Sequence, residues 1–319
     1  MGVATPPRLA GWTPIAVRDD GQGTVVRWCF TEGAQFDEPF FEQTIDRCLR
    51  DPFRLLFWRE TGIDALAELA SEAPVLEPSG FIFHMSRCGS TLVARMLGSL
   101  PRVLVVSEAG PIDEILRTGA VDWLRWMVSA LGQSRRPGQT RLVIKLDAWA
   151  IFALPLVREA FPAVPCVFVY RDPVEVVVSH LGHRGYHTVP GTLPPEWLGL
   201  SELMLQTLEP EQYVAAVLGA ICDAAVARAR AGALTLVNYD SLPGSVAAAV
   251  APLFGIAVGP AARAAFALAA GQDAKNPYIQ FVPDRADKRR RADARVREAV
   301  DVWLRPSYEA LEQLRVRAP

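Results

Sequence analysis

The sequence lacks the features that define several common classes of protein. Its five cysteines are far apart and none forms a C-x-x-C pair, which argues against the usual zinc sites and redox dithiols and favours a reducing compartment. The first twenty residues mix prolines with charges, so we expect no secretory signal. The longest apolar stretch, Val246 to Ala262, is interrupted by prolines and glycines and falls short of the ~20 apolar residues that a membrane span requires. We therefore expect a soluble, cytoplasmic protein without a membrane partner.

The chain also lacks an excess of charge of either sign. The chain of 319 residues has 33 Lys and Arg against 35 Asp and Glu, a net charge of −2. This balance argues against a nucleic-acid partner, so any basic site must be local. Half of the residues are hydrophobic and 21% are charged, which is an ordinary globular composition with enough chain to bury a large core.

The N-terminal part differs in pattern from the rest. Residues 13–30 contain two β-prone runs around a turn of sequence DDGQG, which predicts a hairpin. Helical patterns follow at 40–50 and 63–70, and a stretch rich in Pro, Ser and Gly then ends them. We predict two domains, an N-terminal hairpin and helix extension at 1–77 and an α/β domain at 78–319.

Short apolar strands alternate with amphipathic helices in the second of these domains. The strands are predicted at 81–85, 102–106, 141–145, 166–170 and 233–239. This alternation predicts an α/β fold of the P-loop nucleotide-binding type, with a central parallel sheet and helices on both faces, plus a small N-terminal α+β extension. In such a sheet ligands bind beyond the carboxyl ends of the strands. The alanine-rich region 214–270 is predicted to be helical.

A first candidate anion site follows the strand at 81–85. The segment SRCGSTL, residues 86–92, leads into a helix, and such glycine-bearing turns direct backbone N–H groups and the helix dipole at a phosphate. An ATP-type loop, G-x-x-x-x-G-K-[ST], would have lysine where this chain has Ser90. A cation is supplied by Arg87 instead. The plainer alternative is a tight glycine turn with no ligand.

This segment resembles the phosphosulfate loop of sulfotransferases that use 3′-phosphoadenosine-5′-phosphosulfate (PAPS), [PS]-[KR]-S-G-[ST]-T-[LW], and departs from it only at Cys88. The resemblance implies PAPS as co-substrate, no metal, and an Arg87 that contacts the leaving phosphate and the sulfuryl group. It implies further that five consecutive backbone amides bind the 5′-phosphate, those of Cys88, Gly89, Ser90, Thr91 and Leu92.

A second candidate anion site lies in CVFVYRDPVEVVVSHL. A buried strand ends at Arg171, and Pro173 begins a helix that places Ser179 two turns further on. The Arg and Ser that bind the 3′-phosphate in PAPS sulfotransferases have this same separation. The alternative is that Arg171 forms a capping ion pair with Asp172 and that Ser179 faces solvent.

Besides Arg87, two residues are candidates for the chemistry itself. Glu108 lies 21 residues after Arg87, a spacing similar to that between the loop arginine and the catalytic glutamate of tyrosylprotein sulfotransferases, and we expect it to be the base. Lys145 ends a predicted strand and is expected to stabilise the transition state as a point charge. Glu108 has the alternative role of beginning the next helix.

The base is not settled between Glu108 and a histidine. Cytosolic sulfotransferases use a histidine, and the chain has four. The candidates are His84, His180 and His183. Of these, His84 precedes the loop on a strand, where a structural, hydrogen-bonded role is the alternative.

Other residues resemble the family's remaining nucleotide contacts. Tyr239 follows the last predicted strand, at the place of a tyrosine that lies near the nucleotide in the family. Lys275 and Lys288 fall in the place of a late nucleotide-closing loop and are expected to bind the cofactor. The alternative for the basic run 285–297 is a solvated helix face.

The function predicted from these segments is in-line transfer of a sulfuryl group to a small-molecule hydroxyl or amine acceptor. One rival is a P-loop kinase or NTPase, with Asp147 as a possible magnesium ligand. The other is a non-catalytic nucleotide-binding relative. The identity of the acceptor and the oligomeric state are left open by the sequence.

Overall fold

The computed structural model describes residues 9–72, 75–276, 278–280, 282 and 284–317. The chain divides into two compact units. The first comprises Met1–Phe81, Ala94–Leu146 and Ala153–Val164. The second comprises Ile82–Val93, Asp147–Phe152 and Pro165–Pro319.

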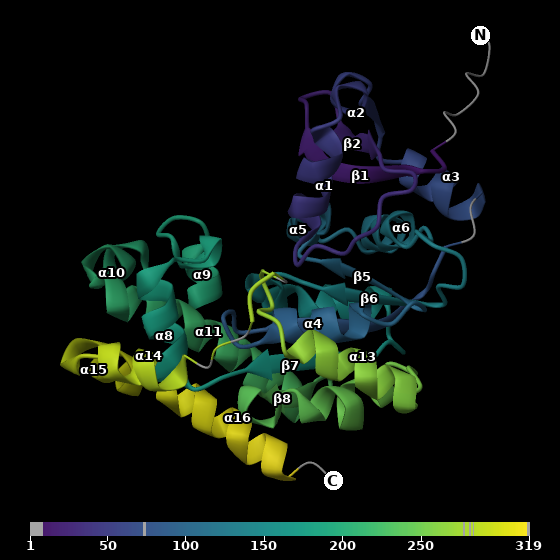
Figure 1. Cartoon of the computed structure of the whole chain (residues 1–319). Coiled ribbons are helices and arrows are strands. Elements are labelled where there is room, and N and C mark those ends of the chain that lie inside the picture. Colours follow the sequence, from purple (N-terminus) through teal and green to yellow (C-terminus); the bar gives the residue numbers. More distant parts are fainter. Residues whose placement is uncertain (1–8, 73–74, 277, 281, 283, 318–319) are drawn as a thin grey trace. The chain divides into compact units, whose positions relative to one another are not determined.

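The first unit contains a small antiparallel sheet, in purple and blue in Figure 1, whose strands are β1 (Trp12–Asp19), β2 (Thr24–Phe30) and β3 (Arg59–Gly62), in the order β1-β2-β3. The hairpin of β1 and β2 confirms the prediction for 13–30. Its turn is fixed by Asp20, whose Oδ1 accepts hydrogen bonds from the N–H groups of Gln22 at 2.9 Å and Gly23 at 3.0 Å. β3 pairs with β2 and was not predicted.

The helices of the first unit are α1 (Phe41–Leu49), α2 (Pro52–Leu56), α3 (Ala65–Glu72), α5 (Gly110–Thr118), α6 (Val121–Leu131) and α7 (Leu154–Ala160). Polar contacts join the hairpin to the segment after α6. The Gln133 side chain accepts from the N–H of Gly11 at 3.1 Å and donates to the carbonyl of Trp12 at 2.7 Å. The N-terminal residues thus pack in one unit with residues 94–146, while the domain boundary near residue 77 stays a prediction.

A five-stranded sheet has the order β5-β6-β4-β7-β8. Its strands are β4 (Pro78–His84), β5 (Val103–Ser107), β6 (Arg141–Lys145), β7 (Cys166–Tyr170) and β8 (Thr235–Asn238). β5 and β6 are parallel, as are β7 and β8. All residues of β5 and β7 are buried, as expected of strands covered by helices. The predicted α/β class, a central parallel sheet with a small N-terminal α+β extension, is confirmed.

The second unit is largely helical. It contains α8 (Pro173–Gly182), α9 (Pro195–Leu198), α10 (Glu202–Thr207), α11 (Pro210–Arg230), α12 (Ala251–Leu253), α13 (Pro260–Ala270), α14 (Arg285–Arg291), α15 (Ala294–Trp303) and α16 (Arg305–Arg317). Short 3₁₀ helices span Ala148–Ala153, Tyr186–Thr188 and Tyr239–Ser241, and a π-helical turn spans Val246–Val250. α4 (Ser90–Gly98) has residues in both units.

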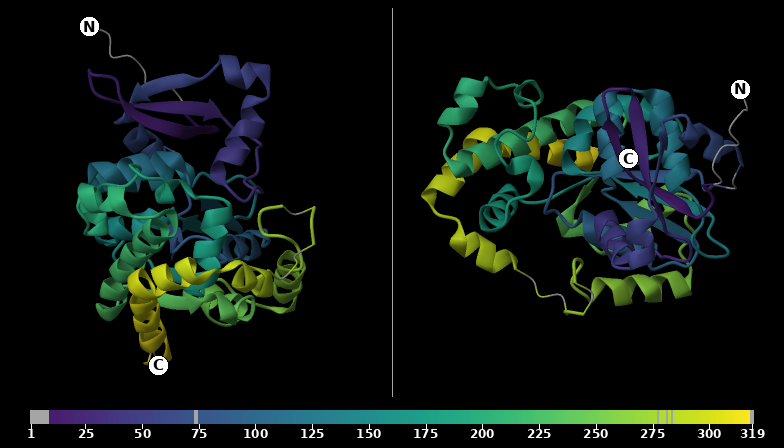
Figure 2. Two further views of the ribbon diagram at one scale, coloured as in Figure 1. Left: turned by 90° about the vertical axis from the view of Figure 1, so that its left-hand side faces the viewer. Right: turned by 90° about the horizontal axis from the view of Figure 1, so that it is seen from above.

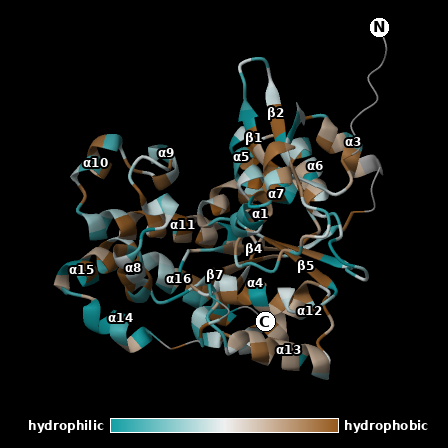
Figure 3. Cartoon of the chain, turned by 45° about the horizontal axis from the view of Figure 1, so that its top comes forward, coloured by the Kyte–Doolittle hydropathy of each residue, from teal (hydrophilic) through white to brown (hydrophobic). Residues whose placement is uncertain are grey.

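α11 is the central helix of the second unit. α15 and α16, yellow in Figures 1 and 2, pack against it, and α14 packs against α8. Within the described ranges α11 alone is long and apolar enough to cross a membrane by length and composition, but 61% of its apolar window is buried inside the protein, as in the core helix of a globular fold. Figure 3 shows α14, in contrast, as hydrophilic.

A partly buried polar cluster fixes α16 to the ends of β7 and β8. Glu312 accepts hydrogen bonds from the Tyr170 hydroxyl, from Asn238 at 2.8 Å and from Arg315 at 2.9 Å. Burial raises the pKa of Glu312, but the bonds from Arg315, Tyr170 and Asn238 outweigh this effect and lower the pKa to about 2. Ionised Glu312 therefore stabilises the folded chain above its usual pKa, and this contribution is lost as the pH falls from about 4.5 to about 2.

We expect Glu312→Gln to lower the free energy of unfolding at pH 7 by about 1–3 kcal/mol, because the amide keeps the shape and loses the charge. The difference from wild type should shrink toward zero as the pH falls below about 4.5. Urea unfolding at several pH values measures this. Glu309→Gln, an exposed change on the same helix, is the control. A destabilisation that does not change with pH would contradict this role of Glu312.

Candidate functional site

The loop between β4 and α4 has an unusual backbone. Ser86, Arg87 and Gly89 have φ angles of 73°, 49° and 90°. In the described part of the chain, the non-glycine residues with positive φ are Ser86, Arg87 and Glu108. A left-handed conformation costs a non-glycine residue roughly 1–3 kcal/mol, so it persists only where the surroundings enforce it, and it is common at functional sites. All three residues lie in segments that the sequence analysis selected.

Side chains around the loop hold this backbone in place. The Cys88 thiol is buried and donates to the carbonyl of Val169 on β7 at 3.0 Å. That carbonyl also accepts from the N–H of Met85 at 3.1 Å. His84 is buried and accepts from the N–H of Ser86 through Nδ1 at 3.0 Å. The side chain of Cys88 therefore anchors the loop to β7.

Gly89 is required by its neighbours as well as by its φ angle. A Cβ at this position would lie 2.7 Å from Cδ2 of Tyr239 and 2.9 Å from Cδ1 of Leu242. The Tyr239 ring thus packs directly on the loop. The guanidinium of Arg171 lies 4.0 Å from the centroid of the same ring, in a cation–π contact. Tyr239 therefore connects the loop to the arginine that ends β7.

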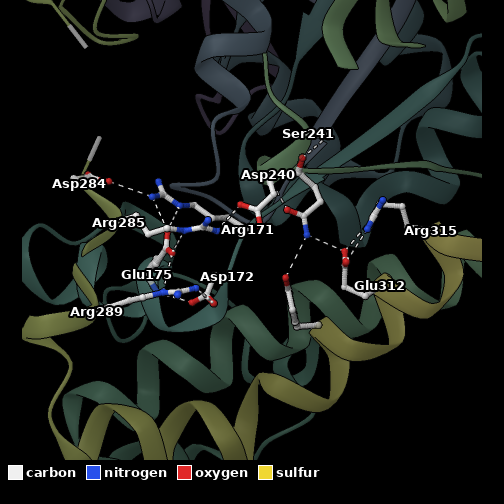
Figure 4. Close-up of polar contacts among 12 residues, drawn as sticks. Arg171, Asp172, Glu175, Asp240, Ser241, Asp284, Arg285, Arg289, Glu312 and Arg315 are labelled. Carbon is white, nitrogen blue, oxygen red and sulfur yellow. Dashed lines mark hydrogen bonds and ion pairs between the residues drawn. The ribbon is translucent and has the colours of Figure 1, made fainter. Parts of the chain in front are cut away.

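Arg171 belongs to a network of charged side chains, drawn in Figure 4. Its Nε donates to Glu175 at 2.7 Å, and its Nη2 lies 3.1 Å from Oδ1 of Asp284. Glu175 has 0% side-chain exposure and also pairs with Arg285 at 2.6 Å and Arg289 at 3.3 Å. A buried carboxylate is tolerated only when it is paired and hydrogen-bonded, and here three arginines converge on one.

The start of α8 explains how Arg171 and Glu175 meet. Asp172 is the N-cap of the helix, its side chain accepts from the N–H of Glu175 at 3.2 Å, and Pro173 occupies the first helical position. Residues four apart lie on one face of a helix, which brings Glu175 back to Arg171. The same spacing places Ser179 one turn beyond Glu175, where it is half-buried.

Charge interactions in this network shift the pKa values of Arg171 and Asp284. Burial acts to lower the pKa of Arg171, but Tyr239 and Glu175 outweigh it and raise the pKa. Burial raises the pKa of Asp284, but hydrogen bonds from Lys288 and Arg171 lower it below its usual value. Both shifts favour the charged forms of Arg171 and Asp284.

The two lysines predicted to contact a nucleotide differ in their surroundings. Lys288 is largely buried, and its Nζ lies 2.7 Å from Asp284, within the network around Arg171. Lys275 is exposed, and its N–H donates to Asp273 at 2.9 Å. Arg87, from the loop, donates through Nη2 to the carbonyl of His183 at the end of α8, at 2.8 Å.

Glu108 and Lys145 form an ion pair within the first unit. The Lys145 side chain has 0% exposure and Glu108 has 22%. The N–H of Glu108 donates to the carbonyl of Lys145 at 2.7 Å, and Lys145 Nζ lies 5.2 Å from the ring centroid of Phe40. Glu108 has a φ of 52° and precedes α5, whose N-cap is Ala109. The Glu108 carboxylate is thus partly exposed and paired with a buried lysine.

The histidine candidates for the base have other roles in the fold. His84 braces the loop through Nδ1, as described above. His180 is fully buried, its Nδ1 accepts from the N–H of Gly185 at 3.2 Å, and burial together with His187, Arg87 and other cations lowers its pKa to about 2. Such a low pKa makes His180 a weak base. His183 offers its backbone carbonyl to Arg87.

The structure brings some of the predicted residues together within each unit. Within the second unit one continuous set of contacts joins Gly89, Tyr239, Arg171 and Lys288, the last through Asp284. Glu108 and Lys145 meet in the first unit.

Several members of the network were missed by the sequence analysis. They are Glu175, Asp284, Arg285 and Arg289. A signal for Glu175 was its four-residue spacing from Arg171, which predicts an ion pair on a helix. Arg285 and Arg289 were assigned to a solvated basic run.

No protein-family model and no curated protein matches this sequence. Solved structures similar to it include a sulfotransferase from Alicyclobacillus acidocaldarius, with a TM-score of 0.46 and 17% identity over 77% of this chain and 98% of that chain. The sulfotransferase domain from the curacin biosynthetic pathway has a TM-score of 0.45 and 13% identity over 77% of this chain and 100% of that chain. Mouse sulfotransferase SULT7A1, complexed with PAP, has a TM-score of 0.42 and 13% identity over 79% of this chain and 93% of that chain.

The contact between Gly89 and Tyr239 can be tested by adding one methyl group. We expect Gly89→Ala to lower the free energy of unfolding by about 2–4 kcal/mol, from the strained φ together with the clash against Tyr239. Gly191→Ala is the matched control, because Gly191 has a φ of 83° and nothing within 4 Å of a Cβ. We expect it to cost only about 1–2 kcal/mol. Chemical denaturation of both variants measures the difference, and equal losses would refute close packing of Tyr239 on the loop.

Proposed function

We propose that this chain is a sulfotransferase that moves a sulfuryl group from PAPS to a hydroxyl or amine acceptor. The observation that supports this most is the contact set Gly89–Tyr239–Arg171, which links a strained loop at a helix N-terminus to an arginine-rich network within one compact unit. Both ends of this set suit oxyanions. A nucleotide with phosphates at its 5′ and 3′ positions has the matching chemistry.

The loop is the proposed site for the 5′-phosphate. Successive backbone N–H groups in a loop with left-handed residues form an anion-binding concavity, and the dipole of α4 adds partial positive charge at its start. We assign the amides of residues 88–92 to the 5′-phosphate. Arg87 has a planar fork that bridges two oxyanions, so it suits the junction of phosphate and sulfuryl group.

The network around Arg171 is the proposed site for the 3′-phosphate. Arg171 is mostly buried and held from two sides by Glu175 and Tyr239, so its fork is preorganised and loses little freedom on binding. Lys288 adds a second cation. Ser179, on the same helix, is assigned a hydroxyl contact to this phosphate, and exposed Lys275 a further contact to the nucleotide.

Sulfuryl transfer needs a base and stabilisation of the leaving group. PAPS supplies a sulfuryl group that is activated by its bond to the 5′-phosphate. We assign Glu108 to accept the proton of the acceptor O–H or N–H while the new bond to sulfur forms. The sulfur–oxygen bond to the phosphate breaks, and its electron pair stays on the phosphate oxygen. Arg87 and Lys145 are assigned to stabilise that charge.

The sequence of the loop weighs against a kinase or NTPase. Such an enzyme needs a lysine on the phosphates in the slot that Ser90 occupies here. The remaining alternative is a non-catalytic nucleotide-binding protein. In an enzyme the carboxylate of Glu108 would accept a proton, whereas in a binding protein it would have no chemical role.

Replacement of Glu108 separates an enzyme from a binder. We expect Glu108→Gln to reduce turnover of PAPS with a reactive acceptor at least about 100-fold, because the amide cannot accept the proton, and to leave affinity for the product nucleotide 3′-phosphoadenosine 5′-phosphate (PAP) within about threefold. Product formation with a panel of phenols, alcohols and amines measures turnover, and calorimetry measures affinity. Glu114→Gln, on α5, is the control. Unreduced turnover would remove Glu108 as the base, and a parallel loss of PAP affinity would make its role structural.

A further inference from the structure

A single carboxylate contacts both cations that we assign to the 3′-phosphate. Asp284 has Oδ1 at 3.1 Å from Nη2 of Arg171 and Oδ2 at 2.7 Å from Nζ of Lys288. The side chains of Arg171 and Lys288 are only 6% and 12% exposed, whereas Asp284 is 48% exposed. Two oxygens of one anionic group thus bridge two largely buried cations, which is also what a phosphate would do.

The other carboxylate partner of Arg171 has a different character. Glu175 is fully buried, lies on the same helix four residues away and is shared with Arg285 and Arg289. Displacing Glu175 from Arg171 would separate a fully buried carboxylate from a largely buried cation, which is costly. Asp284, the residue before α14, contacts Arg171 in Figure 4 and is about half exposed, so it is the partner that can exchange with an incoming anion.

The count of charges supports such an exchange. Four cations meet four carboxylates in this network: Arg171, Arg285, Lys288 and Arg289 with Asp172, Glu175, Asp240 and Asp284. The described network is therefore neutral. A phosphate monoester adds about 1.5 to 2 negative charges, so binding beside a retained Asp284 would create a like-charge contact.

We infer that Asp284 occupies the place of the nucleotide's 3′-phosphate on Arg171 and Lys288, and that the nucleotide binds by displacing it. This inference rests on the proposed function. Asp284 is then a determinant of affinity that acts only on nucleotides with a 3′-phosphate. It weakens the binding of PAPS and of its product PAP, and so favours release of the product from the network.

We predict that removing the negative charge of Asp284 tightens the binding of PAP. We expect Asp284→Asn to bind PAP about three- to tenfold more tightly than wild type, because the neutral amide competes less well for Arg171 and Lys288. Affinity for adenosine 5′-monophosphate, which has no 3′-phosphate, should stay within about twofold. Isothermal titration of the full chain with each nucleotide measures both quantities. Asp284→Ala is a second variant with the same expected direction.

Asp287→Asn is the matched control. Asp287 lies on α14, three residues further along the chain, and pairs with exposed Arg290 at 3.2 Å. Its replacement should change neither affinity by more than about twofold. PAP affinity that is unchanged or weaker in both Asp284 variants, with wild-type folding by circular dichroism, would overturn the inference, as would equal tightening for the two nucleotides. Failure of the wild-type chain to bind PAP would instead overturn the proposed function together with the inference.

Discussion

The carboxylate of Glu175 is fully buried and must be paired, because an unpaired charge in the protein interior is costly. Arg171, Arg285 and Arg289 meet this requirement, and they come from the end of β7 and from α14, more than a hundred residues later in the chain. Pairing with Glu175 therefore ties α14 to α8 and directs the fork of Arg171 across the ring of Tyr239. The proposed 3′-phosphate site depends on this single buried acid.

In the loop before α4, side chains hold the backbone in place, and the backbone N–H groups are the proposed phosphate ligands. Cys88 donates its thiol to β7, and His84 accepts from the loop's own backbone. These bonds make the left-handed conformation of Ser86 and Arg87 tolerable, at a cost of about 1–3 kcal/mol for each residue. The thiol in place of the serine typical of similar loops thus retains a structural bond, and the proposed phosphate contacts belong to the backbone.

The sequence was sufficient for features that depend on neighbouring residues. The hairpin and the five strands of the sheet follow from local patterns of β-branched residues and turns, and the loop at 86–92 from its motif. β3 was missed because its sequence, RETG, has little β propensity, and it forms only because β2 offers an edge. The pairing of Glu175 with Arg285 spans 110 residues and leaves no local signal, so the basic run was treated as a solvated face.

The proposed function requires the chain to bind an adenine nucleotide with a 3′-phosphate through these two anion sites. Calorimetric titration of the wild-type chain with PAP, beside ADP and ATP with magnesium, tests it most directly. We predict micromolar binding of PAP and much weaker binding of ADP and ATP. Binding of ATP with magnesium in preference to PAP would contradict it and would assign the loop at 86–92 to a kinase-like site.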